Sequence, residues 1–205
     1  MILRNSTDQP WHFAVYQKYP SSPGLTSIAW QVRGIPPKTS PDVPAASAEI
    51  NWTMEYGVCI ANFDSDNRKF TGAQYAPALL GNNYKVISLD NIPSVSPTPT
   101  GTGSPDQIVL KNATSPPALK LTMGFTLSNK IVAVEDDVGG MQRTIFRVHP
   151  SYYVACYRNI THGQLVDEGV GFGPIEVRYE EGAHVTIVEA FKDAAGNYQL
   201  RVVPT

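Results

Sequence analysis

Apolar and polar residues alternate along most of the chain, most clearly over residues 48–63. The apolar residues of this stretch occupy every second position: Ile50, Trp52, Met54, Tyr56, Val58 and Ile60. Successive side chains of a β-strand point to opposite faces of its sheet, so this period predicts one long strand that is buried on one face. Such a strand needs other strands beside it and a second apolar layer over its face.

The same period predicts further strands on both sides of this stretch. Residues 11–19 and 25–33 come first, with turn-forming residues between them, and we expect them to form an antiparallel hairpin. Residues 71–80 are ambiguous, and Ser128-Asn129 is expected to be a turn. Shorter strands are predicted at 84–89, 108–112, 119–127, 131–134, 144–148, 152–160, 175–179, 184–191 and 198–203.

Helical signals are almost absent. No apolar pattern of helical spacing extends over ten residues, and 16 Gly and 17 Pro residues interrupt the chain. We therefore predict an all-β protein, a two-sheet antiparallel β-sandwich of about ten to twelve strands, with a β-barrel as the alternative. The long connections at 34–47 and 90–107 favour the sandwich, because they allow the chain to cross between sheets.

The length predicts a single domain over residues 1–205. Pro, Ser, Thr and Gly dominate residues 90–107, which cannot bury enough apolar surface to offset the entropy lost on ordering. We expect a flexible, exposed loop there. No repeat with a period of about 20 to 50 residues is present.

Charge and hydropathy exclude several classes of partner. A net charge of −2 without a basic run disfavours nucleic-acid binding. No apolar run is long enough for a membrane-spanning helix. The first residues lack the apolar core and cleavage site of a signal peptide, so we expect a protein that is cytoplasmic or released without a cleavable signal peptide.

Two residue types admit covalent modification. Cys59 and Cys156 are far apart in the sequence, and we expect two free, buried thiols rather than a disulfide. Asn-x-Ser/Thr triplets begin at Asn5, Asn51, Asn112 and Asn159, and these matter as glycosylation acceptors only if a eukaryote secretes the protein.

No catalytic motif is present. The glycine run from Gly169 to Gly173 is not followed by a helical pattern, and Pro174 removes a donor that a phosphate loop would use. A zinc site would require the fold to gather histidines that lack metal-binding spacing, namely His12, His149, His162 and His184. We expect no cofactor. Calcium is the one ion that the carboxylates of the loops are suited to bind.

Two acidic pairs are the candidate calcium ligands: Asp64 with Asp66, and Asp136 with Asp137 in the acidic loop expected at 135–140. Carboxylate oxygens are the ligands that calcium prefers, but the spacing of an EF-hand is absent. The alternative interpretation is that both pairs lie in solvated turns.

Tyrosines give the strongest indication of a binding surface. Tyr16, Tyr152 and Tyr157 lie in predicted strands, where residues on one face should contact water, and His149 lies close by. We take these four as candidate ligand-binding residues, because an exposed tyrosine can stack on a sugar ring or lie in a protein interface. The alternative is a tyrosine packed at a sheet edge with its hydroxyl in water.

Several blocks of sequence occur in a familiar order: residues 11–17 (WHFAVYQ), 27–30 (SIAW), 50–52 (INW), 146–153 (FRVHPSYY) and 163–167 (GQLVD), with Asn197-Tyr198 near the end. This order resembles the rhizosphere-induced protein (RhiA-like) family, named for a quorum-regulated protein of rhizobia, with relatives in other bacteria and in fungi. The match is poor over residues 64–118, and His12-Phe13 stands where an aromatic–cysteine pair is common. The family has no established biochemical activity, so the resemblance implies a β-sandwich and no catalytic residues.

Three functions remain open. The first is a non-catalytic binding or interaction protein that uses an aromatic surface to bind a protein, a glycan or a small ligand, in contact with a host or with other cells. The second is a self-associating structural protein that buries a sheet face in a homodimer. The third is an enzyme whose site combines distant Asp, Glu and His residues. We expect binding rather than catalysis.

Overall fold

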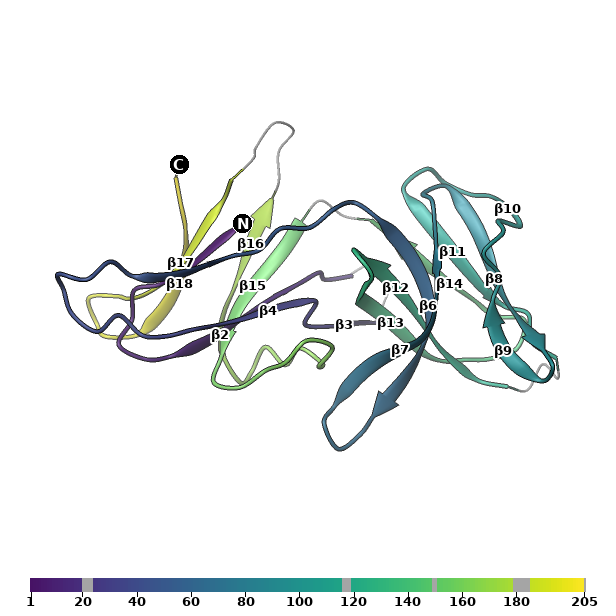
Figure 1. Ribbon diagram of the computed structural model, residues 1–205, viewed down its shortest axis with the longest axis horizontal. Helices are drawn as coiled ribbons and strands as arrows, with labels where there is room; N and C mark the ends of the chain where they lie inside the picture. The colour runs from purple at the N-terminus through teal and green to yellow at the C-terminus, as the bar shows by residue number, and fades with distance from the viewer. Residues whose placement is uncertain (20–23, 116–118, 149–150, 179–184, 205) are drawn as a thin grey trace. The chain divides into compact units, whose positions relative to one another are not determined.

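The computed structural model describes residues 1–19, 24–115, 119–148, 151–178 and 185–204 (Figure 1). These residues form eighteen strands and no helix, and none of their four sheets closes into a barrel. The all-β prediction is confirmed, and the arrangement is consistent with the predicted sandwich. In this described part of the chain, no helix has the length and apolarity that crossing a membrane requires.

The chain divides into two compact units. Unit 1 contains Met1–Gln17, Ala29–Asn51 and Pro150–Thr205, and unit 2 contains Lys18–Ile28 and Trp52–His149. Each unit has its own pair of sheets. The stretch for which we predicted one domain therefore contains two clusters of contacts.

Unit 1 is built from two four-stranded sheets. The first has the order β18 (Tyr198–Val203), β17 (Ile187–Lys192), β1 (Ile2–Asn5) and β5 (Ala46–Glu49). The second has the order β16 (Phe172–Arg178), β15 (Ser151–Tyr157), β2 (Trp11–Tyr16) and β4 (Gln31–Ile35). All neighbours are antiparallel except β1 and β17, which are parallel.

Unit 2 is built from two five-stranded sheets. One contains β10 (Gly101–Thr102), β8 (Asn82–Leu89), β11 (Gln107–Asn112) and β14 (Arg143–Arg147), with β9 (Ile92–Val95) also paired to β8. The other has the order β3 (Leu25–Ser27), β13 (Lys130–Val138), β12 (Leu121–Leu127), β6 (Tyr56–Asp64) and β7 (Lys69–Pro77). Here β8 and β11 form the one parallel pair.

The two units share one strand topology. Strands β1, β2, β4 and β5 of unit 1 have the same pairings as β11, β12, β13 and β14 of unit 2, and β15 to β18 correspond to β6 to β9. Leu3 pairs with Val188 and Ala48, as Leu110 pairs with Tyr84 and Thr144. The chain therefore contains two copies of an eight-stranded pattern, and each unit combines the first half of one copy with the second half of the other.

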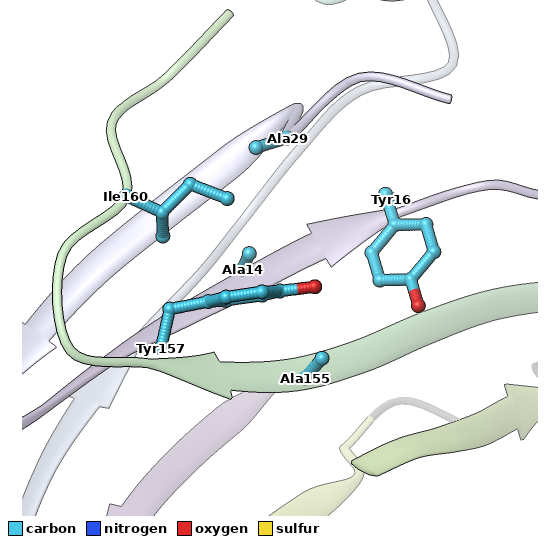
Figure 2. Packing of buried hydrophobic residues seen from close by; sticks show 6 residues of the cluster. All are labelled: Ala14, Tyr16, Ala29, Ala155, Tyr157 and Ile160. Atoms are coloured by element: carbon cyan, nitrogen blue, oxygen red, sulfur yellow. The ribbon is translucent and has the colours of Figure 1, made fainter. Parts of the chain in front are cut away.

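Buried residues occupy both faces of the central strand β2. Phe13 and Val15 point to one face, and Ala14 and Tyr16 point to the other, because side chains alternate along a strand. Figure 2 shows the second face, where Ala14, Tyr16, Ala29, Ala155, Tyr157 and Ile160 form an apolar cluster. Ile160 belongs to the segment that follows β15, so this segment covers a sheet face that the period-two pattern predicts to be solvated.

The long strand expected at 48–63 is two strands, β5 and β6. The chain leaves unit 1 after Asn51 and enters unit 2 at Trp52, and Met54 and Glu55 are exposed between the strands. The apolar residues continue to occupy every second position across the break, because those of both strands fall on even-numbered positions. Period-two patterning therefore could not reveal the break.

The strand expected at 25–33 is also divided. Its second part, β4, pairs with β2 in the predicted antiparallel manner, but its first part, β3, pairs with β13 in unit 2. Such breaks account for much of the difference between eighteen strands in four sheets and the ten to twelve strands in two sheets that we expected. The parallel pairs also depart from the purely antiparallel prediction.

Turn chemistry explains two hairpins. Ser128 and Asn129 adopt φ angles of 50° and 60°, which confirms the predicted turn between β12 and β13. Asp90 and Asn91 adopt φ angles of 50° and 63° between β8 and β9. Two left-handed residues are typical of a tight type I′ hairpin, so the segment 90–107 begins with a hairpin turn and carries two short strands. Its flexibility stays a prediction.

Candidate ligand-binding site

Unit 1 contains a pocket with aromatic walls and a volume of about 480 Å³. Its lining comes from the start of β2, the segments before β16 and β18, and those strands themselves: Trp11, Arg158, Val170, Gly171, Phe172, Gly196, Asn197 and Tyr198. Pockets that bind small ligands typically have volumes of about 300 to 1,000 Å³. We name this site the aromatic pocket.

Three rings form the apolar wall of the aromatic pocket. The Trp11 ring contacts Phe172 edge-on at a centroid distance of 4.8 Å and Tyr198 at 5.0 Å. Phe172 and Tyr198 stack on each other at 5.8 Å with an interplanar angle of 28°. Trp11 is only 5% exposed, whereas Phe172 and Tyr198 are half-buried. The last two rings are therefore the ones that a ligand can contact.

A polar network fixes the Trp11 ring. Its Nε1 donates a hydrogen bond to Thr7 Oγ1 at 3.0 Å, and Thr7 Oγ1 in turn donates to Asn5 Oδ1 at 2.8 Å. The Arg158 guanidinium lies 4.0 Å from the centre of the Trp11 ring, and its Nη1 donates to Gln9 Oε1 at 3.1 Å. Among the described residues, Arg158 has no carboxylate partner, so its positive charge stays available to a ligand.

A tight turn places Asn197 beside Tyr198. Asp193 Oδ1 accepts hydrogen bonds from the backbone N–H groups of Ala195 at 2.9 Å and Asn197 at 2.8 Å. The bond from Asn197 is the largest cause of a lowered pKa of the Asp193 carboxyl group. Gly196 adopts a φ of 85° in this turn, a conformation that favours glycine. Asn197 itself is exposed, where its amide can reach a ligand.

Gly171 allows the chain to pass close to β15. A Cβ atom at this position would lie 2.1 Å from the carbonyl oxygen of Cys156. Any other residue would therefore displace the segment that leads into Phe172, and with it one wall of the aromatic pocket.

Unit 1 contains a second pocket, with a volume of about 430 Å³. It is lined by Ser6, Thr7, Asp8, Lys38, Thr39, Ser40, Pro41 and Lys192, and we name it the polar pocket. Tyr198 connects the two, because its hydroxyl donates to Asp8 Oδ1 at 3.1 Å while Lys192 Nζ donates to Asp8 Oδ2 at 2.8 Å. Lys192, followed by Tyr198, holds the pKa of the Asp8 carboxyl group below its usual value.

The tyrosines proposed from the sequence are not on the surface. Tyr16, Tyr152 and Tyr157 are 0%, 2% and 3% exposed. The expectation that one face of their strands contacts water is therefore wrong for these residues, because the segment after β15 covers that face. Their assignment as ligand-binding residues stays a prediction, and so does that of His149, which lies outside the described residues.

The buried tyrosines still have distinct surroundings. The Tyr16 hydroxyl donates to Glu168 Oε1 at 2.7 Å, and the Tyr152 ring stacks on Trp30 at 5.7 Å. The Tyr157 hydroxyl is buried and has no hydrogen-bond partner among the described residues. Burial raises the pKa of Tyr157 to about 12, with smaller contributions from Glu168 and Asp167.

The first acidic pair, proposed for calcium, lies in unit 2 in a turn. Asp64 Oδ1 accepts from the N–H groups of Asp66 at 3.1 Å and Asn67 at 3.2 Å. Asp64 thus stabilises its own turn. The described residues contain no group of three or more His, Cys, Asp or Glu side chains placed to hold a metal ion, and the calcium prediction remains untested.

The second acidic pair belongs to a strand rather than to the expected loop. Asp136 and Asp137 form a β-bulge in β13 opposite Thr122, and Asp137 has a φ of 57°. Asp136 Oδ1 accepts from the Thr122 hydroxyl, and Lys120 Nζ lies 3.4 Å from Asp137 Oδ2. The bulge gives Asp136 and Asp137 a structural role, because the extra residue bends the strand and turns side chains away from the sheet.

The described residues thus define an all-β protein with an aromatic-walled pocket in one of its two units. A family model described as RhiA matches residues 1–201, and the chain belongs to this family. No curated protein and no solved structure gives a significant match to the chain.

Proposed function

We propose that this protein is a non-catalytic carbohydrate-binding protein that holds a sugar ring in the aromatic pocket. The observation that carries the proposal is the pair of half-buried rings, Phe172 and Tyr198, supported from behind by Trp11. The C–H faces of sugar rings pack against aromatic rings, which bring much apolar area and little conformational entropy to a binding site.

The polar groups at the rim match the hydroxyl groups of a sugar. Asn197 Nδ2 donates one hydrogen bond to Asp193 Oδ2 at 3.3 Å, so its amide offers a ligand one further donor and an acceptor, and the Arg158 guanidinium offers several donors in a plane. An apolar wall with a few fixed polar groups is typical of a small-ligand site. Glycans cover cell surfaces, so a protein of this kind would act in contact with a host or with other cells.

The lining of the aromatic pocket favours binding over catalysis. Among the described residues that form it there is no carboxylate, histidine or cysteine. Hydrolysis or group transfer on a sugar needs an acid and a base or nucleophile within reach of the bond that reacts. A pocket in unit 2, of about 560 Å³, combines Glu135 with Lys111 and Arg143, and its described lining contains no aromatic residue.

The proposal is tested by isothermal titration calorimetry after a screen of wild-type protein on a glycan array. We compare the wild type with Phe172→Ala and with Phe63→Ala, which removes a 43% exposed phenylalanine of unit 2. We expect Phe172→Ala to weaken binding at least about tenfold, because a stacked ring contributes about 1–3 kcal/mol, and Phe63→Ala to leave it unchanged. Absence of any glycan ligand, or equal effects of the two substitutions, would contradict the proposal.

A further inference from the structure

Positive side chains gather around the aromatic and polar pockets. Arg158 lines the first, Lys38 and Lys192 line the second, and Asp8 is the only carboxylate among the described lining residues of both. The whole chain carries a net charge of −2, so this local excess of positive charge does not follow from composition. A ligand that spans both pockets would meet a positive field.

A hydrogen bond links the linings of the two pockets, which have no described residue in common. Tyr198 lines the aromatic pocket, and its hydroxyl bonds to Asp8, which lines the polar pocket. Lys192 Nζ lies 5.1 Å from the centre of the same tyrosine ring. A charged group attached to a sugar ring stacked on Tyr198 would therefore lie near Lys192, which lines the polar pocket together with Lys38.

The polar pocket contains donors that the protein does not use. Lys192 is neutralised by Asp8, and the Thr7 hydroxyl is bonded to Asn5. Among the described residues, no hydrogen bond or ion pair engages the side chains of Lys38 and Thr39. The backbone N–H of Lys38 donates to Thr7 O at 2.8 Å, which fixes the start of this segment against the connection between β1 and β2.

We propose that the polar pocket is an anion subsite, and that the ligand is an acidic saccharide whose carboxylate is bound by Lys38 with help from Thr39. This inference rests on the proposed function, because the sugar ring lies in the aromatic pocket. A singly charged carboxylate matches Lys38, which has no acidic partner among the described residues, whereas Lys192 is paired with Asp8. A uronic acid carries such a group on the ring that would stack on Tyr198.

The experiment compares two matched ligands by calorimetry: an oligogalacturonate and the same oligosaccharide with its carboxyl groups as neutral methyl esters. The variants are Lys38→Gln, Phe172→Ala and the control Lys85→Gln, whose lysine lies on β8 in unit 2. Circular dichroism confirms that each variant is folded.

We expect wild-type protein to bind the acidic ligand about tenfold more tightly than the ester, and this preference to disappear at high salt. Lys38→Gln should remove the preference while leaving the affinity for the ester within about twofold, whereas Lys85→Gln should change neither affinity. Phe172→Ala should weaken the binding of both ligands.

Two results overturn the inference, and they are distinguishable. If both ligands bind equally and Lys38→Gln has no effect, the anion subsite is wrong while carbohydrate binding stands. If neither ligand binds and the glycan array finds no other saccharide, both the proposed function and the anion subsite are wrong.

Discussion

Asn5 and Asn112 make the same hydrogen bonds at the same place in the two units. Asn5 Oδ1 accepts from the N–H and the hydroxyl of Thr7 at 3.0 and 2.8 Å, and Asn112 Oδ1 accepts from those of Thr114 at 3.2 and 2.7 Å. Each Nδ2 donates to backbone carbonyl groups of neighbouring segments, Gln9, Ile35 and Pro36 in one unit and Leu119 and Val138 in the other. Both side chains are fully buried, so these Asn-x-Thr triplets serve the fold.

We predict that Asn5→Ala and Asn112→Ala each destabilise the protein by about 3 kcal/mol. Each change removes the donor of one buried carbonyl group, that of Ile35 or Val138, and the buried acceptor of the threonine N–H and hydroxyl, at a cost of about 1–3 kcal/mol per buried group. Urea unfolding monitored by tryptophan fluorescence measures the effect, with the exposed Asn62→Ala as the control. A loss of unfolding free energy no larger than that of the control would mean that the shared Asn-x-Thr hydrogen bonds do not stabilise the units.

We predict that residues 52–148 fold on their own. This continuous segment contains all strands of unit 2 except β3, which covers an edge of β13. The fragment should give a β-type circular dichroism spectrum, dispersed NMR signals and a cooperative unfolding transition. Residues 1–51 lack β15 to β18 and should remain unfolded. A disordered fragment 52–148 would show instead that the two units fold only together, as one domain.

Local rules predicted much of the fold because strand patterning and turn chemistry act over a few residues. The Ser128-Asn129 turn followed from the sequence alone, and so did a strand at 119–127, which the structure has as Leu121–Leu127. The breaks inside 48–63 and 25–33 did not, because two strands in the same phase look like one. The combination of half of one copy with half of the other in each unit depends on which strands pair across the chain. The apolar period within a strand carries no information about that pairing.

The duplication nevertheless left a trace in the sequence. Residues 2–7 read Ile-Leu-Arg-Asn-Ser-Thr, and residues 109–114 read Val-Leu-Lys-Asn-Ala-Thr. The match lies about half a chain apart, far outside the period of 20 to 50 residues at which repeats were sought. A comparison of the two halves of the chain would have found it.

The aromatic pocket was beyond the reach of local patterning. Trp11, Phe172 and Tyr198 are distant in sequence and meet only because β15 pairs with β2 and β17 with β1. The tyrosines that patterning selected are buried, because the segment after β15 covers the outer face of their sheet. A strand that is covered on both faces gives a continuous apolar run in place of alternation, as residues 13–16 do, and such a run does not show which segment covers it.

We predict that Tyr157→Phe leaves stability at neutral pH unchanged or raises it by about 1 kcal/mol. The substitution removes a buried hydroxyl that has no hydrogen-bond partner in the described part of the chain, so we expect no hydrogen bond to be lost. Tyr16→Phe is the matched comparison and should destabilise the protein by about 1 kcal/mol, because it removes the bond to Glu168. Urea unfolding at neutral pH distinguishes the two, and equal losses would argue that Tyr157 is hydrogen-bonded in solution.

We predict that stability falls as the pH rises above 10. Burial raises the pKa of Tyr157 from 10.0 to about 12 and raises that of Tyr16 further. The unfolded chain therefore loses these protons at lower pH than the folded protein, and alkaline conditions favour unfolding. Tyr157→Phe should show a shallower decline between pH 10 and pH 12. Identical pH profiles for the variant and the wild type would contradict the raised pKa of Tyr157.

We predict that Cys59 and Cys156 react with a thiol reagent only after unfolding. Both are free and buried, as the sequence indicated, and burial raises the pKa of Cys59 to about 12 and that of Cys156 well above its usual value. The thiolate is the reactive form, so native protein should be labelled slowly and urea-unfolded protein rapidly. Rapid labelling of the native protein at neutral pH would show that one of the strands β6 or β15 opens locally.

The most direct test of carbohydrate binding at the aromatic pocket is a titration of ¹⁵N-labelled protein with the best saccharide from the glycan screen, followed by NMR. We expect the backbone signals of Phe172, Asn197 and Tyr198 to move progressively and those of Asp64 and Asp66 in unit 2 to stay fixed. Shifts confined to unit 2, or no shifts at saturating saccharide, would contradict binding at this pocket.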